Sequence, residues 1–378
     1  MKVLITGSNG FVGSNLQAEL FNKKYSGLIE PLYFDRETDI SKLDEYCSYC
    51  DFVVHLAGVN RPKDEKEFME GNYGFTSLVL DLLRKHNNKC PILITSSIQA
   101  SLDNPYGKSK KAGEDLIFEY GKENNVKVLV YRLPNVFGKW CRPNYNSAIA
   151  TFCHNIANDL PIQVNDRNHN MNLVYIDDVI KEIINAINGK ENKVDDYCYV
   201  EPVIKTTLGE IVDTIYSFKE YEKSLGVPNH NDLLTRYLYA TYLSYLPEDK
   251  FSYELTEHKD HRGSFTEIIR TVGQGQFSIN ISHPGITKGN HYHHTKNEKF
   301  LVVQGKALIA FRKVGTDKVI EYEVSDKKLE VINIPTGYTH SITNIGDNEL
   351  ITFMWANEPF DENNPDTIYM EVYQDEEA

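Results

Sequence analysis

The sequence predicts two domains of different classes: an α/β doubly wound parallel sheet over residues 1–247 and an all-β module over residues 248–378. A chain of 378 residues is longer than one hydrophobic core usually supports. In its first part, short apolar runs alternate with amphipathic stretches, the pattern of a parallel sheet with helices on both faces. From about residue 250, β-rich runs follow one another with Gly, Asn, Asp and Pro turns between them.

Five apolar runs in the first part predict strands, at residues 2–7, 31–35, 51–58, 91–97 and 127–133. Amphipathic stretches separate these runs, and residues 76–88 show the apolar spacing of a helix. Residues 135 to about 245 predict a mixed region that includes a helix over residues 207–221.

Six runs in the last part predict β-strands, at residues 264–271, 276–282, 299–314, 319–324, 329–335 and 350–355. Consecutive strands without helices must protect their edges, so we expect a closed or sandwiched module. The change of pattern places the boundary near residues 245–255.

Charge and composition exclude several classes of protein. The net charge of −14 opposes binding to nucleic acid, whose phosphates it would repel. No apolar run in the sequence approaches the roughly 20 residues that cross a bilayer, and no basic and apolar leader precedes the first strand. We therefore expect a cytoplasmic protein without membrane insertion. Cys47 and Cys50 form a lone CxxC pair, which predicts reduced thiols rather than a zinc ribbon.

A glycine-rich turn follows the first predicted strand. Gly7, Gly10 and Gly13 have the spacing of a dinucleotide fingerprint, in which backbone amides approach a pyrophosphate at a helix N-terminus. The second strand ends in Asp35 and Arg36, where the adenosine ribose would lie. Aspartate favours the free 2′-hydroxyl of NAD and arginine the 2′-phosphate of NADP. We favour NADPH because Arg36 offers a bidentate phosphate contact, with Arg61 as a candidate helper.

Tyr106 and Lys110 lie four residues apart, which places them on one face of a predicted helix. An ammonium in this position lowers the pKa of the phenol and holds the nicotinamide ribose. The tyrosine then protonates a carbonyl oxygen as a hydride arrives, and a serine hydroxyl from residues 95–97 steadies that oxygen. With the glycine turn upstream, the pair predicts a carbonyl reductase.

A candidate metal site lies in the β module. His291 and His293 share one face of a predicted strand, Glu298 follows a short turn, and His340 follows a Pro-Gly turn. Three imidazoles and a carboxylate suit zinc first, with nickel, manganese and iron as alternatives. A hydrogen-bonded histidine cluster without metal is the competing interpretation.

The first part, to about residue 245, resembles an extended short-chain dehydrogenase/reductase with a Rossmann-type fold, of the branch that acts on nucleotide-linked sugars. The blocks "TGSNGFVG", "VVHLAGVN", "TSSIQA", "YGKSK", "YRLPNVFG" and "VYIDDV" occur in that family's order. The resemblance implies that Ser97, rather than Ser96, is the catalytic hydroxyl and that Asn135 opens the substrate side. Met171 stands where the family often has a substrate-binding arginine, so Arg167 is the candidate substitute. The implied cofactor contacts are Gly7, Asn9, Gly10, Phe11, Val12, Gly13, Asp35, Arg36, Leu56, Ala57, Gly58, Tyr106 and Lys110.

The last part resembles a cupin, a jelly-roll fold. Gly285-x5-His291-x-His293-x4-Glu298-x6-Gly305 and Pro335-x-Gly337-x2-His340-x3-Asn344 match the two cupin motifs. The blocks "DHRGSFTE" and "ITKGNHYHH" also resemble nucleotide-sugar 3,5-epimerases, cupins that epimerise carbons beside a ketone.

The epimerase resemblance implies that Arg262 binds the substrate diphosphate and that His291 stands at the general base. One histidine nitrogen cannot be both a metal ligand and a free base. We favour the metal because Glu298 and His340 complete its ligand set. The base is then Lys288, Tyr292 or a metal-bound water, and we assign Lys288 a catalytic role.

The whole chain resembles bifunctional capsular polysaccharide enzymes that fuse these two domains; "HLAGVNRP", "FGKWCRPNYNS", "PGITKGN" and "HHTKNEKFLVV" carry the match. The resemblance implies C3 epimerisation and then NADPH-dependent C4 reduction of a UDP-linked 4-keto-6-deoxy-N-acetylhexosamine. The implied product is UDP-2-acetamido-2,6-dideoxy-L-talose, on the route to UDP-N-acetyl-L-fucosamine. A cytoplasmic homodimer with zinc in the cupin is also implied. Two alternatives remain: a 4-ketosugar reductase with a passive cupin, and a non-enzymatic sensor of NADP redox state.

Overall fold

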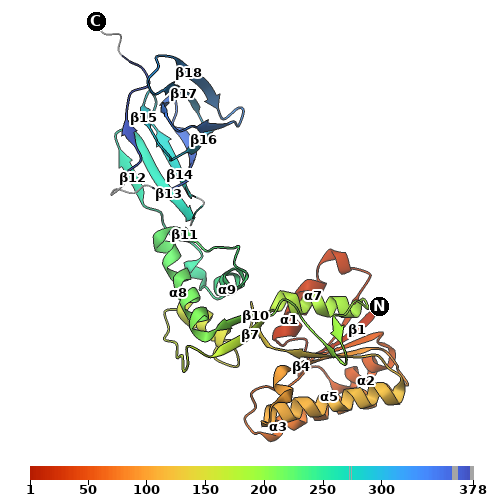
Figure 1. Cartoon of the computed structure of the whole chain (residues 1–378). Helices are drawn as coiled ribbons and strands as arrows, with labels where there is room; N and C mark the ends of the chain where they lie inside the picture. Colours follow the sequence, from red (N-terminus) through yellow and green to blue (C-terminus); the bar gives the residue numbers. More distant parts are fainter. Residues whose placement is uncertain (272, 274, 360–364, 375–378) are drawn as a thin grey trace. The chain divides into compact units, whose positions relative to one another are not determined.

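The computed structural model describes residues 1–271, 273, 275–359 and 365–374, which form two compact units (Figure 1). The first unit comprises Met1–Tyr216 and Leu233–Pro247, and the second comprises Ser217–Asp232 and Glu248–Ala378. The two units have the predicted fold classes, a parallel sheet with helices in the first and antiparallel strands in the second. The domain limits 1–247 and 248–378 stay a prediction.

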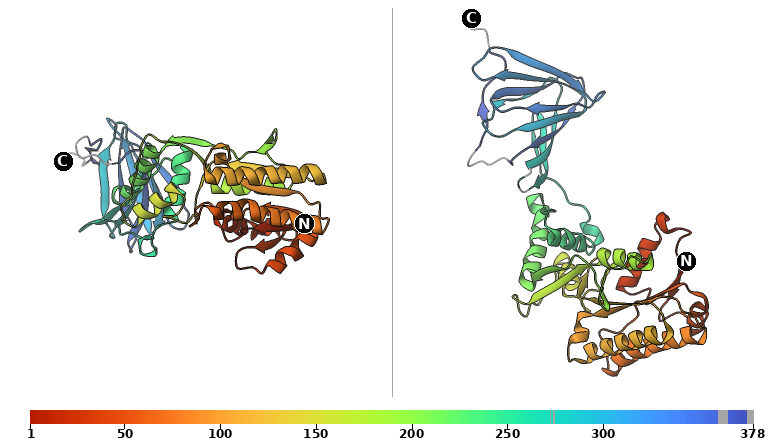
Figure 2. Two further views of the ribbon diagram at one scale, coloured as in Figure 1. Left: turned by 90° about the horizontal axis from the view of Figure 1, so that it is seen from below. Right: turned by 45° about the vertical axis from the view of Figure 1, so that its right-hand side comes forward.

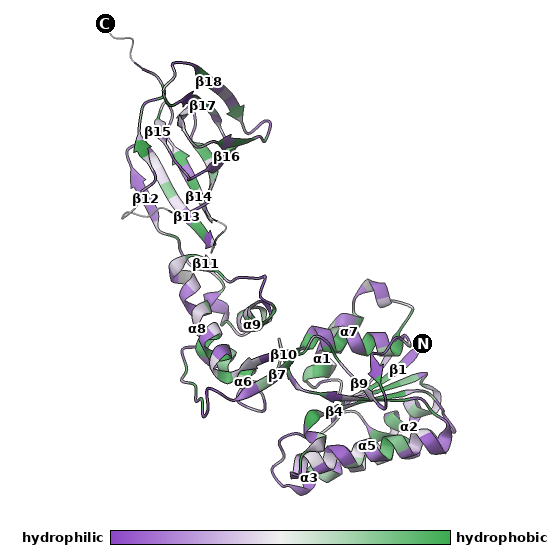
Figure 3. Ribbon diagram, viewed as in Figure 1, coloured by the Kyte–Doolittle hydropathy of each residue, from purple (hydrophilic) through white to green (hydrophobic). Residues whose placement is uncertain are grey.

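A seven-stranded sheet forms the centre of the first unit. Its strands are β1 (Lys2–Thr6), β2 (Glu30–Phe34), β3 (Phe52–His55), β4 (Ile92–Ser97), β5 (Val128–Leu133), β8 (Lys193–Val194) and β9 (Tyr197–Cys198), in the order β2-β1-β3-β4-β5-β9-β8. All neighbours are parallel except β8 and β9. Strands buried on both faces are largely apolar, as the colouring of Figure 3 shows. The five predicted strands of this sheet are confirmed.

Helices cover both faces of this sheet (Figures 1 and 2). One face carries α1 (Phe11–Leu20) and α7 (Ile176–Ile187), and the other carries α2 (Ile40–Tyr49), α4 (Phe75–Lys85) and α5 (Pro105–Asn124). The core beneath α4 and α5 includes Leu80 and Ile117, both fully buried. Shorter elements are η1 (Lys23–Tyr25), α3 (Lys66–Met69), η2 (Glu70–Gly74) and η3 (Ile98–Ser101).

Helix α5 has well-defined ends. Pro105 occupies its first turn, where a missing backbone N–H costs little, and the Asn104 side chain caps the helix by accepting from the Gly107 N–H at 2.7 Å. Asn125 ends the helix in the left-handed conformation. The cap fixes the first turn, which carries the Tyr106 side chain.

A small three-stranded sheet, in the order β10-β7-β6, completes the first unit. It contains β6 (Asn135–Phe137), β7 (Asn170–Tyr175) and β10 (Ile204–Thr207). The helices of this region are α6 (Ala148–Ala157), α8 (Leu208–Ser224) and α9 (Leu233–Leu243), and α6 packs on α9.

Two sheets form most of the second unit, antiparallel except where β11 pairs with β13, and the right-hand view of Figure 2 shows them facing each other. One has the order β11-β13-β14-β21-β16-β19, with β12 also paired to β13, and the other has the order β18-β17-β20-β15-β22. The first contains β11 (Gly226–Val227), β12 (Glu257–Asp260), β13 (Gly263–Thr271), β14 (Gly275–Ser282), β16 (Glu298–Gln304), β19 (Val331–Ile334) and β21 (Leu350–Ala356). The second contains β15 (Thr287–Tyr292), β17 (Lys306–Lys313), β18 (Val319–Ser325), β20 (Tyr338–Asn344) and β22 (Ile368–Tyr369), and η4 (Glu248–Lys250) precedes β12 in the chain.

The core of this unit packs between the sheets, with Phe300 and Leu350 from one and Ile309 and Ile342 from the other. The predicted strand over residues 299–314 is two strands, β16 and β17, because Gly305 turns the chain at φ +89° between them. The chain thereby crosses from one sheet to the other.

Candidate functional sites

The glycine turn after β1 requires glycine for steric reasons. Gly7 has φ +71°, and a Cβ there would lie 2.7 Å from the backbone nitrogen of Ala57. A Cβ on Gly13 would overlap the carbonyl oxygens of Gly7 and Ser8. The turn therefore brings the N-terminus of α1 close to the end of β3. The turn continues through Asn9 and Gly10, and α1 begins with Phe11 and Val12. This order, a glycine turn that opens a helix, is the one that the dinucleotide fingerprint requires.

The turn after β2 holds the two residues proposed for the adenosine ribose. The Asp35 carboxylate accepts hydrogen bonds from the Asn9 amide and, at 2.9 Å, from the Glu37 N–H. Arg36 follows in an exposed position. Asp35 thus ties the glycine turn to the end of β2, and the Arg36 guanidinium lies on the surface, which is compatible with a 2′-phosphate. The choice between NAD and NADP stays a prediction.

Gly58, after β3, connects the cofactor loop to the reducing groups. A Cβ on Gly58 would lie 2.8 Å from the Oδ1 atom of Asn72 and 3.1 Å from the Nζ atom of Lys110. Leu56 and Ala57 lead into this close approach. The predicted cofactor residues and the catalytic lysine therefore meet in one place.

The structure also brings Ser97, Tyr106 and Lys110 together. The Ser97 side chain hydrogen-bonds the Tyr106 hydroxyl, and the Lys110 Nζ lies 6.0 Å from the centroid of the Tyr106 ring. The Lys110 Nζ donates to the Thr95 carbonyl at 3.2 Å. Burial raises the pKa of Tyr106, and the hydrogen bond with Ser97 offsets part of that rise. Burial lowers the pKa of Lys110 to about 8, against the opposing charge of Glu114.

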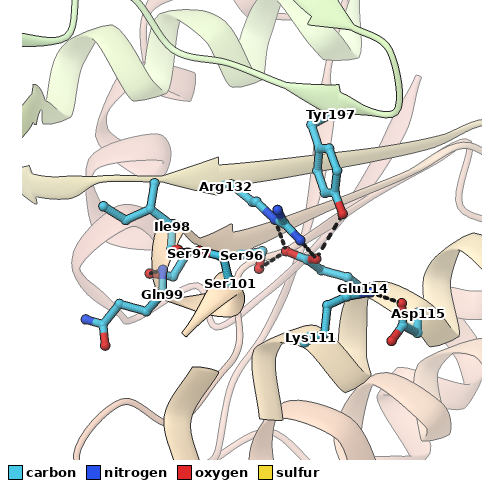
Figure 4. Close-up of polar contacts among 10 residues, drawn as sticks. All are labelled: Ser96, Ser97, Ile98, Gln99, Ser101, Lys111, Glu114, Asp115, Arg132 and Tyr197. Carbon is cyan, nitrogen blue, oxygen red and sulfur yellow. Dashed lines mark hydrogen bonds and ion pairs between the residues drawn. The ribbon is translucent and has the colours of Figure 1, made fainter. Parts of the chain in front are cut away.

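Ser96 instead points toward Glu114 and Arg132, as Figure 4 shows. Its hydroxyl donates to the Glu114 carboxylate at 2.6 Å and is buried. The fully buried Glu114 also accepts from Arg132 Nε at 2.8 Å, from Arg132 Nη2 at 2.6 Å and from the Tyr197 hydroxyl at 3.3 Å. Ser96 therefore anchors α5 through Glu114, while Ser97, the last residue of β4, reaches Tyr106 in the first turn of the same helix.

The predicted substrate residues of the first unit lie around β6 and β7. Asn135 begins β6 with an exposed side chain, whose amide donates to the Asn172 carbonyl at 3.2 Å. The Arg167 guanidinium is paired with the Asp213 carboxylate at 2.6 Å. Met171 is half-buried on β7. Substrate contacts by Asn135 and Arg167 stay predictions, and Arg167 would have to exchange Asp213 for the ligand.

The four predicted metal ligands converge in the second unit. One ligand atom from each of His291, His293, Glu298 and His340 lies within 4.8 Å of the others. His291 and His340 come from β15 and β20 of one sheet, and Glu298 comes from β16 of the other. The Nε2 atoms of His293 and His340 lie 3.5 and 3.4 Å from a Glu298 oxygen, and all three atoms are buried without a hydrogen bond. Buried polar atoms left without hydrogen bonds fit a bound cation.

The electrostatics of the cluster also favour a cation. Burial lowers the pKa of His291 to about 4, with the His340 and His293 charges acting in the same direction, so its imidazole is neutral and able to bind a metal. Burial raises the pKa of Glu298, but the facing imidazoles of His293 and His340 outweigh it and hold that pKa well below the ordinary value. The anionic carboxylate and the neutral His291 imidazole are ligand forms that divalent ions require. Burial lowers the pKa of His293, but its interactions with Glu298 and the Asp366 carbonyl outweigh burial and raise that pKa, so a metal bound there would displace a proton.

Asp366, which the sequence patterns did not indicate, organises the loop that carries His293. Its backbone carbonyl accepts from the His293 Nδ1 atom, which leaves Nε2 free to face Glu298. Its carboxylate accepts from the backbone N–H groups of His294 at 2.8 Å, Thr295 at 2.7 Å and Lys296 at 2.8 Å. Asp366 therefore fixes both the tautomer and the position of one candidate ligand.

A cavity of about 660 Å³ opens beside the cluster. Its lining includes His291, His293 and Glu298, together with Glu267, Arg270 and Gln276 from β13 and β14. Gln276 is 5% exposed, and its Oε1 atom has no hydrogen-bond partner. No spacing pattern pointed to these last three residues as a group, although Glu267 ends the "DHRGSFTE" block.

Lys288 and Arg262 lie elsewhere in the second unit. The Lys288 Nζ donates to the Asn280 Oδ1 and the Ile281 carbonyl, both at 2.8 Å, and burial lowers the pKa of Lys288. Arg262 stands before β13, where its guanidinium pairs with the Asp260 carboxylate at 2.6 Å. The roles of Lys288 as base and Arg262 as diphosphate ligand stay predictions.

Family models match both parts of the chain. The NAD dependent epimerase/dehydratase family matches residues 3–199, and the polysaccharide biosynthesis C-terminal domain matches residues 258–368. The chain belongs to the NAD dependent epimerase/dehydratase family. Membership of this family indicates a nicotinamide cofactor. The glycine turn, Gly58 and Lys110 lie where the family fingerprint expects this cofactor to bind. In the part of the chain that the structure describes, no helix is long and apolar enough to span a membrane.

Two full-length relatives extend this assignment. A "UDP-2-acetamido-2,6-beta-L-arabino-hexul-4-ose reductase" of Pseudomonas aeruginosa is 47% identical over 373 residues, covering 98% of this chain and 99% of that protein. The crystal structure of the capsular polysaccharide assembling protein CapF from Staphylococcus aureus has 52% identity and a TM-score of 0.93, covering 98% of this chain and 100% of that one. The UDP-glucuronic acid 4-epimerase of Bacillus cereus, at 19% identity and a TM-score of 0.55, covers 65% of this chain and 98% of its own and shares the fold alone.

Proposed function

We propose that this chain is a bifunctional nucleotide-sugar enzyme of capsular polysaccharide biosynthesis. The second unit epimerises C3 of a UDP-linked 4-keto-6-deoxy-N-acetylhexosamine, and the first unit then reduces the C4 ketone with NADPH. The product is UDP-2-acetamido-2,6-dideoxy-L-talose, on the route to UDP-N-acetyl-L-fucosamine. One observation carries the proposal: the chain holds both the Ser97, Tyr106 and Lys110 group and the four-residue ligand cluster. The full-length similarity to a reductase named for a hexul-4-ose supports the substrate class.

The reductive half uses the groups of the first unit. The Tyr106 hydroxyl protonates the C4 oxygen, and the hydrogen bond with Ser97 orients that hydroxyl toward the carbonyl. The Lys110 ammonium, close to the Tyr106 ring, stabilises the phenolate that remains. NADPH, when bound along the glycine turn, supplies the hydride to C4. Gly58 has no side chain to separate the cofactor from Lys110.

The epimerising half requires removal of the C3 hydrogen and its return on the opposite face. His291, His293, Glu298 and His340 would hold a divalent cation, zinc first, which would polarise a sugar carbonyl oxygen as a Lewis acid. Lys288 as base requires its Nζ to leave the acceptors on Asn280 and Ile281. Tyr292, the last residue of β15, is the other side-chain candidate.

The two steps have a necessary order. A C3 hydrogen is acidic only while C4 is a carbonyl, because the resulting anion delocalises as an enolate. Reduction of C4 to an alcohol ends epimerisation and fixes the new stereochemistry. The order gives a chemical reason for placing both activities on one chain. A cytoplasmic homodimer is the assembly that we propose for it.

The alternative is a reductase whose β module is passive. Proton NMR of the UDP-4-keto-6-deoxy sugar in D₂O, with the enzyme and without NADPH, separates the two. Loss of the C3 proton signal supports epimerisation, and a Tyr106→Phe variant should keep this exchange while losing reduction. Retention of the C3 proton by an enzyme that still consumes NADPH would leave the reductase alone.

A further inference from the structure

The cavity beside the ligand cluster continues into a second hollow of about 560 Å³ in the same unit. Both hollows are lined by His258, Glu267 and Arg270, so they form one groove. The backbone of the segment before and within β11 lies along its outer part, where the Arg270 N–H donates to the Leu225 carbonyl at 2.7 Å and Gly226 pairs with Arg270. A ligand longer than a single sugar can therefore extend from the cluster toward this segment.

The inner end of the groove requires a hydrogen-bond donor from its ligand. The Gln276 Oε1 atom is buried in the cavity lining without a partner, and an unpaired buried acceptor costs free energy that a ligand N–H or O–H would recover. A sugar hydroxyl or an acetamido N–H supplies that donor. The sugar part of the substrate therefore belongs at the cluster end.

The outer end has cations and an exposed aromatic ring. Arg270 and Lys223 line it with side chains that are 43% and 74% exposed, and Tyr253 is 52% exposed. Guanidinium and ammonium groups bind diphosphate oxygens, and a tyrosine ring offers a stacking surface for a nucleobase. The Glu267 carboxylate accepts from the Arg270 Nε at 2.9 Å and so fixes the direction of the guanidinium.

We infer that the outer part of this groove, with Arg270, Lys223 and Tyr253, binds the diphosphate and base of the nucleotide sugar whose sugar ring lies at the ligand cluster. The inference rests on the proposed epimerase function. It gives Arg270 the role that the family resemblance implied for Arg262. The two arginines are eight residues apart on the same chain segment, and at ~3.3 Å per residue this places their backbones roughly 26 Å apart.

The main test measures C3 hydrogen exchange in D₂O over a range of substrate concentrations, with full-length enzyme. We expect Arg270→Gln, Lys223→Gln and Tyr253→Ala each to raise the KM for exchange by about fivefold to tenfold, the size expected for one lost charge-assisted or stacking contact. The KM for NADPH-dependent reduction of the already epimerised 4-keto sugar should not change, because that site lies in the other unit. Lys318→Gln, which removes an exposed cation outside the groove, is the matched control. Unchanged exchange KM values in all three variants, or a rise in Arg262→Gln instead, would overturn the inference.

A second readout separates failure of the groove from failure of the epimerase. Photolabelling with 5-azido-UDP-glucose, followed by peptide mapping, should label peptides that contain Tyr253 or Lys223 in addition to the first unit. Labelling of the first unit alone contradicts the groove. Labelling at Tyr253 in an enzyme that shows no C3 exchange supports the groove and rejects the epimerase.

Discussion

His291 and His340 are register partners across the β15–β20 ladder, with ring centroids 4.5 Å apart. Glu298 reaches the same point from β16 in the opposing sheet. A cation bound here would join the two sheets of the second unit. We therefore expect the purified protein to contain about one divalent ion per chain, measured by inductively coupled plasma mass spectrometry.

Removal of that ion should destabilise the second unit. A ligand present at 100 times its dissociation constant adds on the order of 3 kcal/mol to the free energy of unfolding, so chelation should lower the unfolding temperature of this unit by several degrees. His340→Ala should lose both the ion and the chelator effect. His283→Gln, on an exposed histidine paired with Glu349, should keep both. A chelator-insensitive protein that contains no metal would favour a hydrogen-bonded histidine cluster.

The Asp366 side chain should control metal affinity without being a ligand. Asp366→Asn removes the negative charge that accepts from three backbone N–H groups of the loop after His293. We expect a 10- to 100-fold loss of zinc affinity, the range typical for such supporting contacts. Competition with a chromogenic chelator measures it, and Asp317→Asn, at an exposed position, is the control. Equal affinities would mean that the loop keeps its position without this carboxylate.

Ser96 and Ser97 should differ in function although they are neighbours. Ser97→Ala removes the hydrogen bond to Tyr106, so kcat for reduction should fall by about 100-fold or more. Ser96→Ala removes a contact to Glu114 and should lower the free energy of unfolding by about 1 kcal/mol with little change in kcat. Steady-state kinetics and urea unfolding of both variants test this assignment. A large kcat loss in Ser96→Ala alone would reverse it.

Glu114 should be a major contributor to stability. Its carboxylate is fully buried and compensates the charge of Arg132 through two hydrogen bonds. Glu114→Gln leaves the guanidinium partly uncompensated, so we expect a loss of about 3 kcal/mol in the free energy of unfolding. Asp115→Asn, on the exposed side of the same helix, should change it by less than about 0.5 kcal/mol. Urea unfolding monitored by circular dichroism measures both variants.

The pH dependence of reduction should follow Lys110. Its pKa is lowered to about 8 from 10.5, chiefly by burial, so the ammonium loses its proton as pH rises through about 8. The phenolate of Tyr106 then loses its stabilising charge, and kcat/KM for reduction should fall on the alkaline side. Lys110→Arg keeps a charged group throughout this range and should move the alkaline fall to higher pH. An unshifted fall in Lys110→Arg would assign it to another group.

The same pKa shift has an opposite consequence for stability. Between about pH 8 and 10.5 the unfolded chain binds a proton at Lys110 that the folded chain does not. Stability contributed by this group therefore rises with pH across that window, while reductase activity falls. Comparing unfolding of the wild type and Lys110→Arg across the window isolates the contribution.

Much of the site followed from the sequence because its patterns are local. The glycine turn, the Tyr106 and Lys110 pair and the spacing of His291 and His293 are each set within a few residues, and the structure brings the residues of each pattern together. The paired strands β15 and β20 were not among the six apolar runs, because many of their residues are polar; the histidine spacing and the Pro-Gly turn predicted strands there instead.

Contacts between distant segments could not be predicted in this way. Asp366 and His293 are 73 residues apart in the sequence, and no local pattern around either residue predicts their hydrogen bond. Glu114 lies four residues after Lys110, so the sequence places it on the same face of the helix as Tyr106 and Lys110. Its partners Arg132 and Tyr197 come from β5 and β9, and the sequence pattern did not indicate them. Long-range sheet order decides which polar side chains meet.

The assignment of Ser217–Asp232 to the second unit means that the described chain passes between the two units three times. A gene fragment that starts at codon 248 would encode β13 without the β11 segment that pairs with Arg270 and Thr271. Such a fragment would expose part of a strand edge and should self-associate more than one that retains residues 217–232. The two activities therefore cannot be exchanged as single blocks: an exchange of modules between related genes would need three junctions, after residues 216, 232 and 247, rather than one.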